Sequence, residues 1–470
     1  MSEDRPPDHK HPVSGYETTL SGWGRHPVVR ARVEPAFDRQ TLKQSLQAEG
    51  QLIAFGQGRS YGDSALSARV ADMRPLDRML SFDASDGLLV CEAGVLLADV
   101  IGTFLPRGWF LRVTPGTKYT TIGGAIAADV HGKNHHKAGC FGTWVKWIDL
   151  MLADGSVVRC STGQETELFH ATCGGMGLTG IIIQAGILLQ PVPSASIRQT
   201  TVKTRDLAGT FEAFETHHDA PYSVAWIDCI SGGSNLGRSL IMLGDFAGPG
   251  DAAGESGQTE TRRAPSQRKR TIDYTPPGQG VRIPDAFPGS LLNRRTISLF
   301  NALYYRKAPQ GQSSGNVGLD SFFYPLDRLR NWNRIYGRSG MMQYQFILPK
   351  ETSFNGMEEI LAEITKSRMG SFLAVLKLYG PENDHYLSFP MEGYSLALDF
   401  KIQNGLQDLF DRLDRLVIKY NGRVYLAKDA RMSRRMFDRG YPRADRFRKL
   451  RKALGLDKKF QSMQSLRLGL

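Results

Sequence analysis

The sequence lacks the features that mark disulfide-rich, zinc-binding and membrane-spanning proteins. Its five cysteines are an odd number without a CxxC pair, which argues against a disulfide framework and predicts reduced, buried thiols. No apolar run approaches the roughly 18 residues of a membrane span. The first 14 residues are polar and rich in proline, so we expect a disordered tail there and no signal peptide.

The chain is long and basic. Its 470 residues exceed one ordinary core and predict two domains, and its 41% hydrophobic and 23% charged residues are typical of a globular protein. The net charge is +12, and residues 428–459 hold 13 Lys and Arg against 4 Asp and Glu. Such a segment fits a surface facing nucleic acid, anionic lipid or a phosphorylated substrate, or simply a solvated basic face. No RNP-type aromatic motif, zinc finger or helix-turn-helix accompanies it, which argues against nucleic acid.

Short strands and short helices alternate along the first half of the chain. Residues 50–190 hold many β-rich runs separated by brief helical patterns, which predicts an α+β domain. Residues 247–271 carry almost no apolar side chains and are expected to form a flexible loop.

Beyond that loop, residues 394–402 alternate strictly. One face carries apolar side chains, and the other carries Ser395, Ala397, Asp399 and Lys401. This alternation predicts an antiparallel sheet with helices behind it and a ligand in front. A helical pattern then ends at Asn421-Gly422, and strand 423–427 is expected to deliver Lys428 at its end.

Residues 175–180, GMGLTG, match the dinucleotide-binding pattern GxGxxG letter for letter. That fingerprint needs a strand before the glycines and a helix after them, because the pyrophosphate sits on the helix N-terminus. Here a helical pattern precedes the glycines and a strand-like run follows them. The order argues against a Rossmann site.

Three glycine segments combine turns with hydrogen-bonding side chains. Glycines let backbone N–H groups approach an anion closely, and Thr121 can cap a short helix whose first turn holds two glycines. A plain tight turn needs fewer glycines than the first segment has. The residues expected to hold a ligand are Ala54, Phe55, Gly56, Gln57, Gly58, Arg59, Ser60, Tyr61, Gly62 and Asp63 in the first segment, Pro115, Gly116, Thr117, Thr121, Ile122, Gly123 and Gly124 in the second, and Gly177 and Ile182 in the third.

The second segment runs into DVHGKNHH, residues 129–136, which holds three of the ten histidines. A histidine cluster raises the question of a metal site. HExxH spacing is absent, and no Asp, Glu or Cys stands at ligand spacing, so no metal is expected.

Together the three glycine segments resemble the FAD-binding domain of the vanillyl-alcohol-oxidase-type flavoproteins. In that family, two small α+β subdomains hold the pyrophosphate between them without a Rossmann motif. Many members carry a flavin-linked histidine where this chain has Arg59, so the resemblance implies non-covalent FAD.

The pieces HGKNHH and YLAKDAR, with QYQFILP and VLKLYGP, narrow the resemblance to the oxidase family of decaprenylphosphoryl-β-D-ribose 2-epimerases. It covers nearly the whole chain. It implies an FAD-dependent oxidoreductase that oxidises the second-carbon hydroxyl of a polyprenyl-phosphate-linked pentose to a ketone, with hydride transfer to flavin N5. That reaction is the oxidation half of a ribose-to-arabinose epimerisation in arabinan and cell-wall biosynthesis, and a separate NAD(P)H-dependent short-chain reductase would complete it. The alternative is an FAD enzyme of the same fold acting on a soluble alditol, aldonolactone or other sugar.

The family motifs also imply roles for single residues. Lys428, which would stabilise charge on the reduced flavin and orient the hydroxyl, is implied to be catalytic with His131 and Lys377. The implied flavin contacts are His131, Gly132, Lys133, Asn134 and Tyr425, while His135 and His136 are expected to be structural or at the surface. The implied substrate contacts are Tyr324, Gln343, Gln345, Lys377, Ser395 and Lys428.

Two positions depart from the family pattern, which has a cysteine at Ala397 and an asparagine at Ser395. Covalent inhibitors of that family attack the cysteine, so they should fail on this chain. Hydride transfer does not need the cysteine, but the Ser395 change puts the exact sugar in doubt.

The resemblance also divides the chain. It implies an FAD-binding domain at residues 15–195, a substrate-binding domain at 196–422 and a C-terminal segment, 423–470, that returns to the FAD domain. The basic C-terminal segment and the loop sequence RRAPSQRKR would suit a membrane surface with anionic lipids. We therefore expect a cytoplasmic protein or one that is peripheral at the inner face of the membrane.

Overall fold

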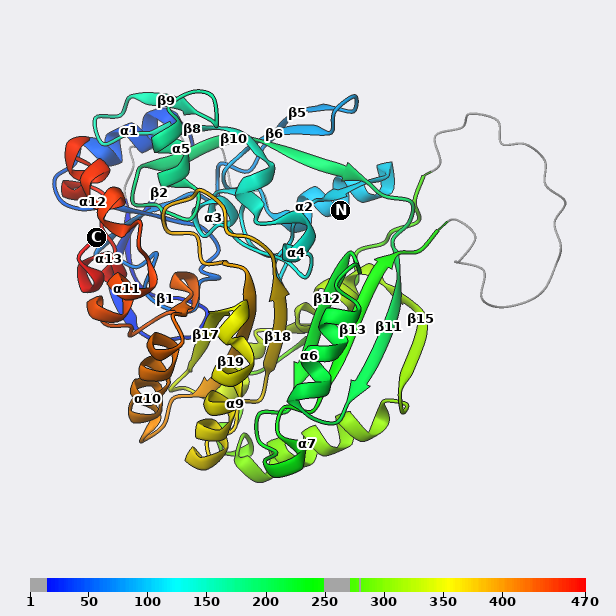
Figure 1. Cartoon of the computed structure of the whole chain (residues 1–470). Coiled ribbons are helices and arrows are strands. Elements are labelled where there is room, and N and C mark those ends of the chain that lie inside the picture. The colour runs from blue at the N-terminus through cyan, green and yellow to red at the C-terminus, as the bar shows by residue number, and fades with distance from the viewer. Residues whose placement is uncertain (1–14, 249–270, 279) are drawn as a thin grey trace, which may run out of the picture.

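The computed structural model describes residues 15–248, 271–278 and 280–470 (Figure 1). The predicted tail at 1–14 and nearly all of the predicted loop at 247–271 lie outside these residues. Helices and sheets are mixed along the described chain, so the predicted α+β class is confirmed. In Figure 1 the N-terminal strands and the C-terminal helices share the upper and left part of the molecule, and a large sheet fills the lower right.

The first sheet is small and mixed. Its strand order is β1 (Tyr16–Ser21), β2 (Val28–Pro35), β4 (Arg69–Asp72) and β3 (Ile53–Phe55), and α1 (Arg39–Gln47) links β2 to β3. Asp38 begins α1 by accepting a hydrogen bond from the Thr41 amide, while the Thr41 hydroxyl oxygen accepts one from the Asp38 amide. Because β3 leads straight into the first glycine segment, this sheet positions that segment.

The second sheet is antiparallel and centres on β10 (Ile181–Pro191). Its order is β5 (Met79–Asp83), β6 (Leu88–Glu92), β10, β8 (Val145–Met151) and β9 (Val157–Cys160), and β7 (Trp109–Leu111) also pairs with β10. The helices that accompany it are α2 (Leu97–Phe104), α3 (Ile122–Ala127), α4 (His135–Ala138) and α5 (Thr166–Thr172). The order α5, glycines, β10 confirms that GMGLTG does not stand in a Rossmann context.

The third sheet has eight antiparallel strands. Its order is β15 (Gln312–Gly318), β11 (Ser196–Thr204), β13 (Ser239–Phe246), β12 (Tyr222–Ile227), β18 (Ala374–Tyr379), β19 (Gly393–Lys401), β17 (Met341–Pro349) and β20 (Arg423–Val424). The helices α6 (Leu207–Thr216), α9 (Lys350–Ser367) and α10 (Leu406–Lys419) lie in front of this sheet in Figure 1. Two further helices, α7 (Arg294–Lys307) and α8 (Leu319–Phe323), and the short paired strands β14 (Val281–Arg282) and β16 (Leu329–Arg330) complete this part.

The alternation of β19 divides the sheet into two environments, as predicted. Tyr394 faces the helices, where its hydroxyl donates to Glu215 of α6 at 2.7 Å. Ser395 and Ala397, on the opposite face, line a cavity. The helix α10 also ends where predicted, since Asn421 adopts a left-handed conformation with φ +55°.

The C-terminal segment forms α11 (Arg434–Gly440), α12 (Ala444–Ala453) and α13 (Met463–Leu468), and it meets the first sheet where the Leu52 amide, next to β3, donates to the Lys459 carbonyl at 2.8 Å. Arg467 joins the parts, because its guanidinium pairs with Asp63 at 2.8 Å and with Asp429 at 2.9 Å. The strand expected to deliver Lys428 is shorter than predicted: β20 ends at Val424, and Lys428 closes a 3-10 turn that begins at Leu426.

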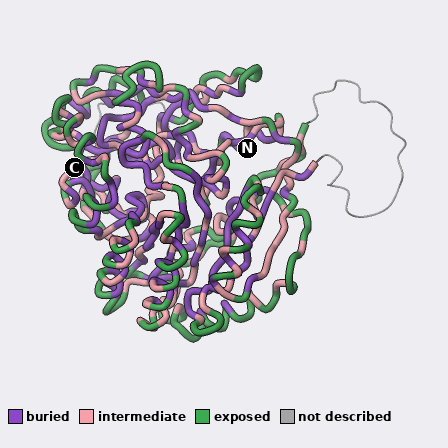
Figure 2. Tube along the Cα trace, in the orientation of Figure 1, coloured by how far each residue is buried: buried purple, intermediate pink, exposed green. Residues whose placement is uncertain are grey.

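Burial separates the interior from the surface (Figure 2). All five cysteines are buried and unpaired, as predicted, and burial raises the pKa of each thiol. Among the described residues, no helix is long and apolar enough to cross a membrane.

Candidate active site

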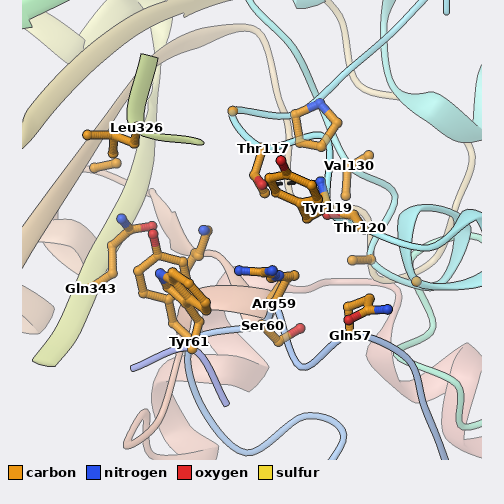
Figure 3. Close-up of a pocket in the computed structure, with 18 of the residues that line it drawn as sticks. Gln57, Arg59, Ser60, Tyr61, Thr117, Tyr119, Thr120, Val130, Leu326 and Gln343 are labelled. Carbon is orange, nitrogen blue, oxygen red and sulfur yellow. Dashed lines mark hydrogen bonds between the residues drawn. The ribbon is translucent and has the colours of Figure 1, made fainter. Parts of the chain in front are cut away.

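A cavity of about 1180 Å³ lies where the three sheets meet (Figure 3). Its wall is formed by all three glycine segments, by the face of β17, β18 and β19 that is opposite the helices, and by the 3-10 turn that holds Lys428. A pocket for one small molecule typically measures roughly 300–1,000 Å³, so this cavity has room for a large cofactor and a second ligand.

The first glycine segment is clamped between two distant parts of the chain. The amide of Trp23 donates to the Ser60 carbonyl at 2.7 Å, and the amide of Tyr61 donates to the Ala427 carbonyl at 2.9 Å. A side chain at Gly62 would lie 1.8 Å from the Asp429 carbonyl oxygen, so only glycine allows this approach. The clamp holds the segment's side chains against the cavity.

Arg59 is half-buried at the cavity with an incomplete set of partners. Its guanidinium lies over the Trp23 ring at 4.3 Å and faces the Tyr119 ring at 5.5 Å, and Figure 3 shows it on the same side of the cavity as Tyr119. Its Nε atom is buried and makes no hydrogen bond with the described residues. Burial lowers the pKa of Arg59, while the nearby Asp327 carboxylate opposes that shift. A buried donor of this kind fits a bound polar or anionic ligand.

The second glycine segment caps a short helix, as predicted. The Thr121 hydroxyl accepts a hydrogen bond from the Gly124 amide at 3.1 Å at the start of α3. A side chain at Gly56 would lie 2.7 Å from the same hydroxyl oxygen, so the first and second segments are packed directly together. This contact brings the small first sheet and the second sheet to one edge of the cavity.

His131 stands at the centre of the polar wall. Its Nε2 atom lies 3.1 Å from Nε2 of Gln345, and its ring contacts Tyr379 and Tyr425 with centroids 5.0 Å apart in each case. Its Nδ1 atom is buried and has no partner among the described residues. Burial, reinforced by the charge of Lys377, lowers the pKa of His131 well below its usual value, so the ring is neutral at physiological pH.

Of the other residues of the DVHGKNHH segment, some face the cavity and others bond to the backbone away from it. Lys133 faces the cavity, where it donates to the Phe322 carbonyl, and burial lowers its pKa to about 7. His135 accepts a hydrogen bond from the Gly380 amide at 3.2 Å, and His136 contacts the Ala220 carbonyl at 2.8 Å. Within the described ranges, no three His, Cys, Asp or Glu side chains gather as a metal site would require.

Lys428 and Asp399 form a charged centre opposite that segment. The Lys428 ammonium lies over the Tyr61 ring, 3.6 Å from its centroid, and the Gln343 amide donates to the Asp399 carboxylate. Burial lowers the pKa of Lys428 and raises the pKa of Asp399, and the attraction between the two charges opposes both shifts. The charge of each group therefore favours the charged form of the other.

A second lysine lies on the neighbouring strand. Lys377 of β18 is half-buried at the cavity wall, and burial lowers its pKa to about 8. On β17, the Gln345 amide contacts the Ser395 hydroxyl at 3.5 Å. Two residues beyond Lys377, on the same strand face, the Tyr379 hydroxyl is buried without a hydrogen-bond partner among the described residues. These groups provide donors and acceptors for a sugar.

The structure places all the predicted site residues on the cavity wall except Asp63, Ile122, Gly132, Asn134 and Tyr324. Each of these five residues forms an ion pair, a hydrogen bond or a packing contact elsewhere in the structure. Asp63 pairs with Arg467, Asn134 donates to the Arg112 carbonyl at 2.8 Å, and the Tyr324 hydroxyl bonds the Thr114 hydroxyl at 2.7 Å. Ile122 is fully buried, and a side chain at Gly132 would meet the Thr114 carbonyl at 2.8 Å.

Sequence reasoning missed the aromatic part of the wall. Trp226, Phe300, Tyr304 and Phe372 line the end of the cavity formed by β12 and α7. Trp226 lies on a strand and Phe300 on a helix, so no single periodicity could group them. Asp399 was assigned to the ligand-facing side of β19, but only the structure brings it to Gln343 and Lys428.

Comparison with known proteins identifies the family. Residues 39–161 match the family described as FAD binding domain. The chain is 37% identical to the decaprenylphosphoryl-beta-D-ribose oxidase of Mycolicibacterium smegmatis over 467 residues, which cover 96% of this chain and 97% of that protein.

The chain belongs to the decaprenylphosphoryl-β-D-ribose oxidase family. As a member of this family it is an FAD-dependent oxidoreductase that acts on CH–OH groups. Other relatives are an uncharacterised protein of Streptomyces coelicolor, 33% identical over 80% of this chain and 99% of that protein, and the L-gulonolactone oxidase of Bos taurus. The latter is 29% identical, but over only 35% of this chain and 37% of its own length.

The cavity fits the cofactor of this family. Its volume exceeds what one small substrate needs, and two buried polar atoms on its wall, Nε of Arg59 and Nδ1 of His131, have no partner among the described residues. Arg59 lies on the first glycine segment and His131 in the DVHGKNHH segment that follows the second, and both would meet the cofactor.

Proposed function

We propose that this enzyme oxidises the second-carbon hydroxyl of a polyprenyl-phosphate-linked pentose to a ketone. The observation that carries the proposal is that Lys428, Lys377 and Gln343, which holds the buried Asp399, line the same cavity as the aromatic side chains of β12 and α7. The polar group suits a sugar, and the apolar end suits a lipid chain. A relative whose name includes decaprenylphosphoryl-beta-D-ribose aligns along nearly its whole length with this chain.

The first and second sheets, with their glycine segments, would hold FAD between them without a covalent bond. Arg59, in place of a flavin-linked histidine, would donate to the cofactor, and His131 would contact the flavin through its neutral ring. When bound, FAD supplies the acceptor for the hydride that leaves the sugar carbon. Residues 15–195 would form this domain, residues 196–422 the substrate domain, and residues 423–470 the segment that returns to the first domain.

Lys428 would act on the proton of the reacting hydroxyl. Because burial lowers its pKa, a share of Lys428 is neutral near physiological pH and can accept that proton as the carbon–hydrogen bond breaks. The ammonium formed is then stabilised by the Asp399 carboxylate and by the face of the Tyr61 ring. Gln343 would keep Asp399 in place through its hydrogen bond.

The remaining hydroxyls of the sugar would contact Gln345, Lys377 and Ser395. At a pH near the lowered pKa of Lys377, about half of the molecules carry a neutral amine there. This side chain can therefore either donate to or accept from a hydroxyl. Ser395 is shorter than the asparagine of the family pattern. Its hydroxyl would therefore contact a sugar through a water, or the extra space would admit a bulkier substituent on the sugar. The ketone product would pass to a separate NAD(P)H-dependent short-chain reductase.

Anaerobic reduction of the flavin tests the proposal. We expect a polyprenyl-phosphate ribose to bleach the flavin absorbance of the purified enzyme, with a ketone detected by mass spectrometry. Ribitol and L-gulono-lactone are the matched soluble substrates, and the similarity to an L-gulonolactone oxidase makes them the relevant alternative. Bleaching by a soluble substrate, with none by the lipid-linked ribose, would replace the proposal by that alternative.

A further inference from the structure

The helix α7 exposes an apolar face. Leu299 and Leu303, one turn apart, have exposed fractions of 62% and 59%. The opposite side of the helix is anchored, because Ile297 is buried and the Asn301 amide donates to Asp228 at 2.9 Å. The helix is therefore held firmly while its outer leucines contact solvent. Figure 1 shows α7 along the lower edge of the large sheet, at the end away from the FAD-binding part.

This outer face continues into the cavity. Phe300 and Tyr304, each next to one of the two leucines in the sequence, are partly exposed and also line the cavity. Inside, Phe300 contacts Phe372 with ring centroids 5.3 Å apart, and Tyr304 contacts Trp226 at 5.0 Å. Contacting aromatic rings thus lead from the surface of α7 into the cavity that Lys377 and Lys428 also line.

Basic residues surround this apolar face. Arg294 and Arg295 begin α7, Arg306 and Lys307 end it, and all four are exposed. From residue 281 to residue 307 the chain holds five basic residues and one acidic residue. Apolar side chains flanked by Arg and Lys are the pattern of a helix that lies in the interface of an anionic membrane.

We propose that α7 docks this enzyme on an anionic lipid bilayer and that the lipid chain of the substrate enters the cavity beside Phe300 and Tyr304. The docking surface consists of Leu299, Leu303 and the four basic residues at the ends of α7. Access of the lipid chain rests on the proposed function, whereas docking on the bilayer does not. The helix would lie parallel to the membrane, with its leucines among the acyl chains and its cations at the lipid headgroups.

Two other arrangements are less compatible with these observations. A second copy of the chain packed on the same face would bring the basic ends of two α7 helices together, and their charges would repel. The basic C-terminal segment uses some of its charge internally: Arg451 is fully buried, and Arg448 pairs with Asp438 and Asp445. That segment therefore offers less charge to a membrane than its sequence suggests.

Sedimentation with vesicles, using the full-length FAD-loaded enzyme at low salt, tests the docking surface. The wild type should bind vesicles that contain phosphatidylglycerol and should bind pure phosphatidylcholine weakly. The double variant L299D/L303D should bind the anionic vesicles at least roughly tenfold more weakly. The variant R306Q/K307Q should bind more weakly and lose part of the salt dependence. The matched control is L454D/L466D, which changes two exposed leucines of the basic C-terminal segment.

The outcomes separate docking from catalysis. Unchanged flavin content and thermal midpoint would show that L299D/L303D is folded, since neither leucine lines the cavity. The proposal is overturned if the wild type does not bind anionic vesicles, or if L454D/L466D loses binding while L299D/L303D keeps it. It is also overturned if size-exclusion chromatography shows that α7 mediates a dimer. Vesicle binding without turnover of lipid-linked ribose would instead refute the proposed function and leave the docking surface intact.

Discussion

The Lys428 ammonium lies over the Tyr61 ring, 3.6 Å from its centroid. This contact joins the C-terminal segment to the first glycine segment at the wall of the cavity. Tyr61 is in turn hydrogen-bonded to Gln343, which also holds Asp399. Through these contacts the proposed proton acceptor, its counter-charge and the proposed cofactor-binding segment lie close together.

Replacing Lys428 by methionine removes the proposed proton acceptor while keeping a side chain of similar length. We expect the rate of flavin reduction by lipid-linked ribose to fall at least about 100-fold, the lower range for general-base catalysis, with flavin content unchanged. Stopped-flow absorbance measures the rate. The control is Lys401→Met, because Lys401 donates to the Gly289 carbonyl outside the cavity. Equal losses in the two variants would show that the effect is not specific to Lys428.

The variant Asp399→Asn should shift the pH dependence of the same rate. The Asp399 carboxylate raises the pKa of Lys428, so removing its charge lowers that pKa further. If neutral Lys428 accepts the proton, the rate rises with pH through this pKa, and its midpoint moves to lower pH in the variant. Asp245→Asn, on the exposed surface, should leave the midpoint in place. A midpoint that stays or moves upward in Asp399→Asn contradicts the assigned role of Lys428.

His131→Ala should weaken flavin binding. The loss of a buried hydrogen-bonding ring costs about 1–3 kcal/mol, or roughly 5- to 150-fold in the flavin dissociation constant. Because the pKa of His131 is well below its usual value, flavin affinity of the wild type should show no step near the ordinary histidine pKa. Fluorescence of released flavin measures both effects. The exposed His218→Ala and treatment with a chelator should change nothing, and a chelator effect would revive the metal hypothesis.

Ala397→Cys should make the cavity sensitive to thiol reagents. Ala397 lines the cavity, whereas no cysteine does among the described residues, and burial raises the pKa of all five native thiols. We expect a small maleimide to label the variant once, with loss of flavin reduction, and to leave the wild type active. Intact-mass spectrometry counts the labels. Inactivation of the wild type at the same rate would mean that a native thiol is accessible.

Arg467→Met should destabilise the C-terminal segment. The change leaves the buried carboxylates of Asp63 and Asp429 without their shared guanidinium, which costs about 3 kcal/mol. Urea unfolding measures the free energy of unfolding, and flavin release should occur at lower urea. The exposed Arg435→Met should be nearly neutral. If the two variants have the same free energy of unfolding, the ion pairs of Arg467 contribute little to stability.

Local features of the fold could be predicted because they depend on neighbours in the chain. The capping residue Thr121, the alternation along β19 and the end of α10 at Asn421-Gly422 follow from helix and strand periodicity and from turn chemistry. The order of α5, glycines and β10 likewise excluded a Rossmann site from the sequence. The strand before Lys428 was predicted too long, because a two-residue strand has no periodicity from which to read its end.

The sequence by itself determined the family motifs, the glycine segments and the residue types on the ligand-facing strands. Only the tertiary structure decided which of those side chains share the cavity. It closed Tyr324 onto Thr114 and Asp63 onto Arg467, it brought Asp399 to Lys428, and it left Leu299 of α7 exposed. The physical reason is that a polar group's partner, and an apolar group's exposure, depend on packing between segments that are not neighbours in the sequence.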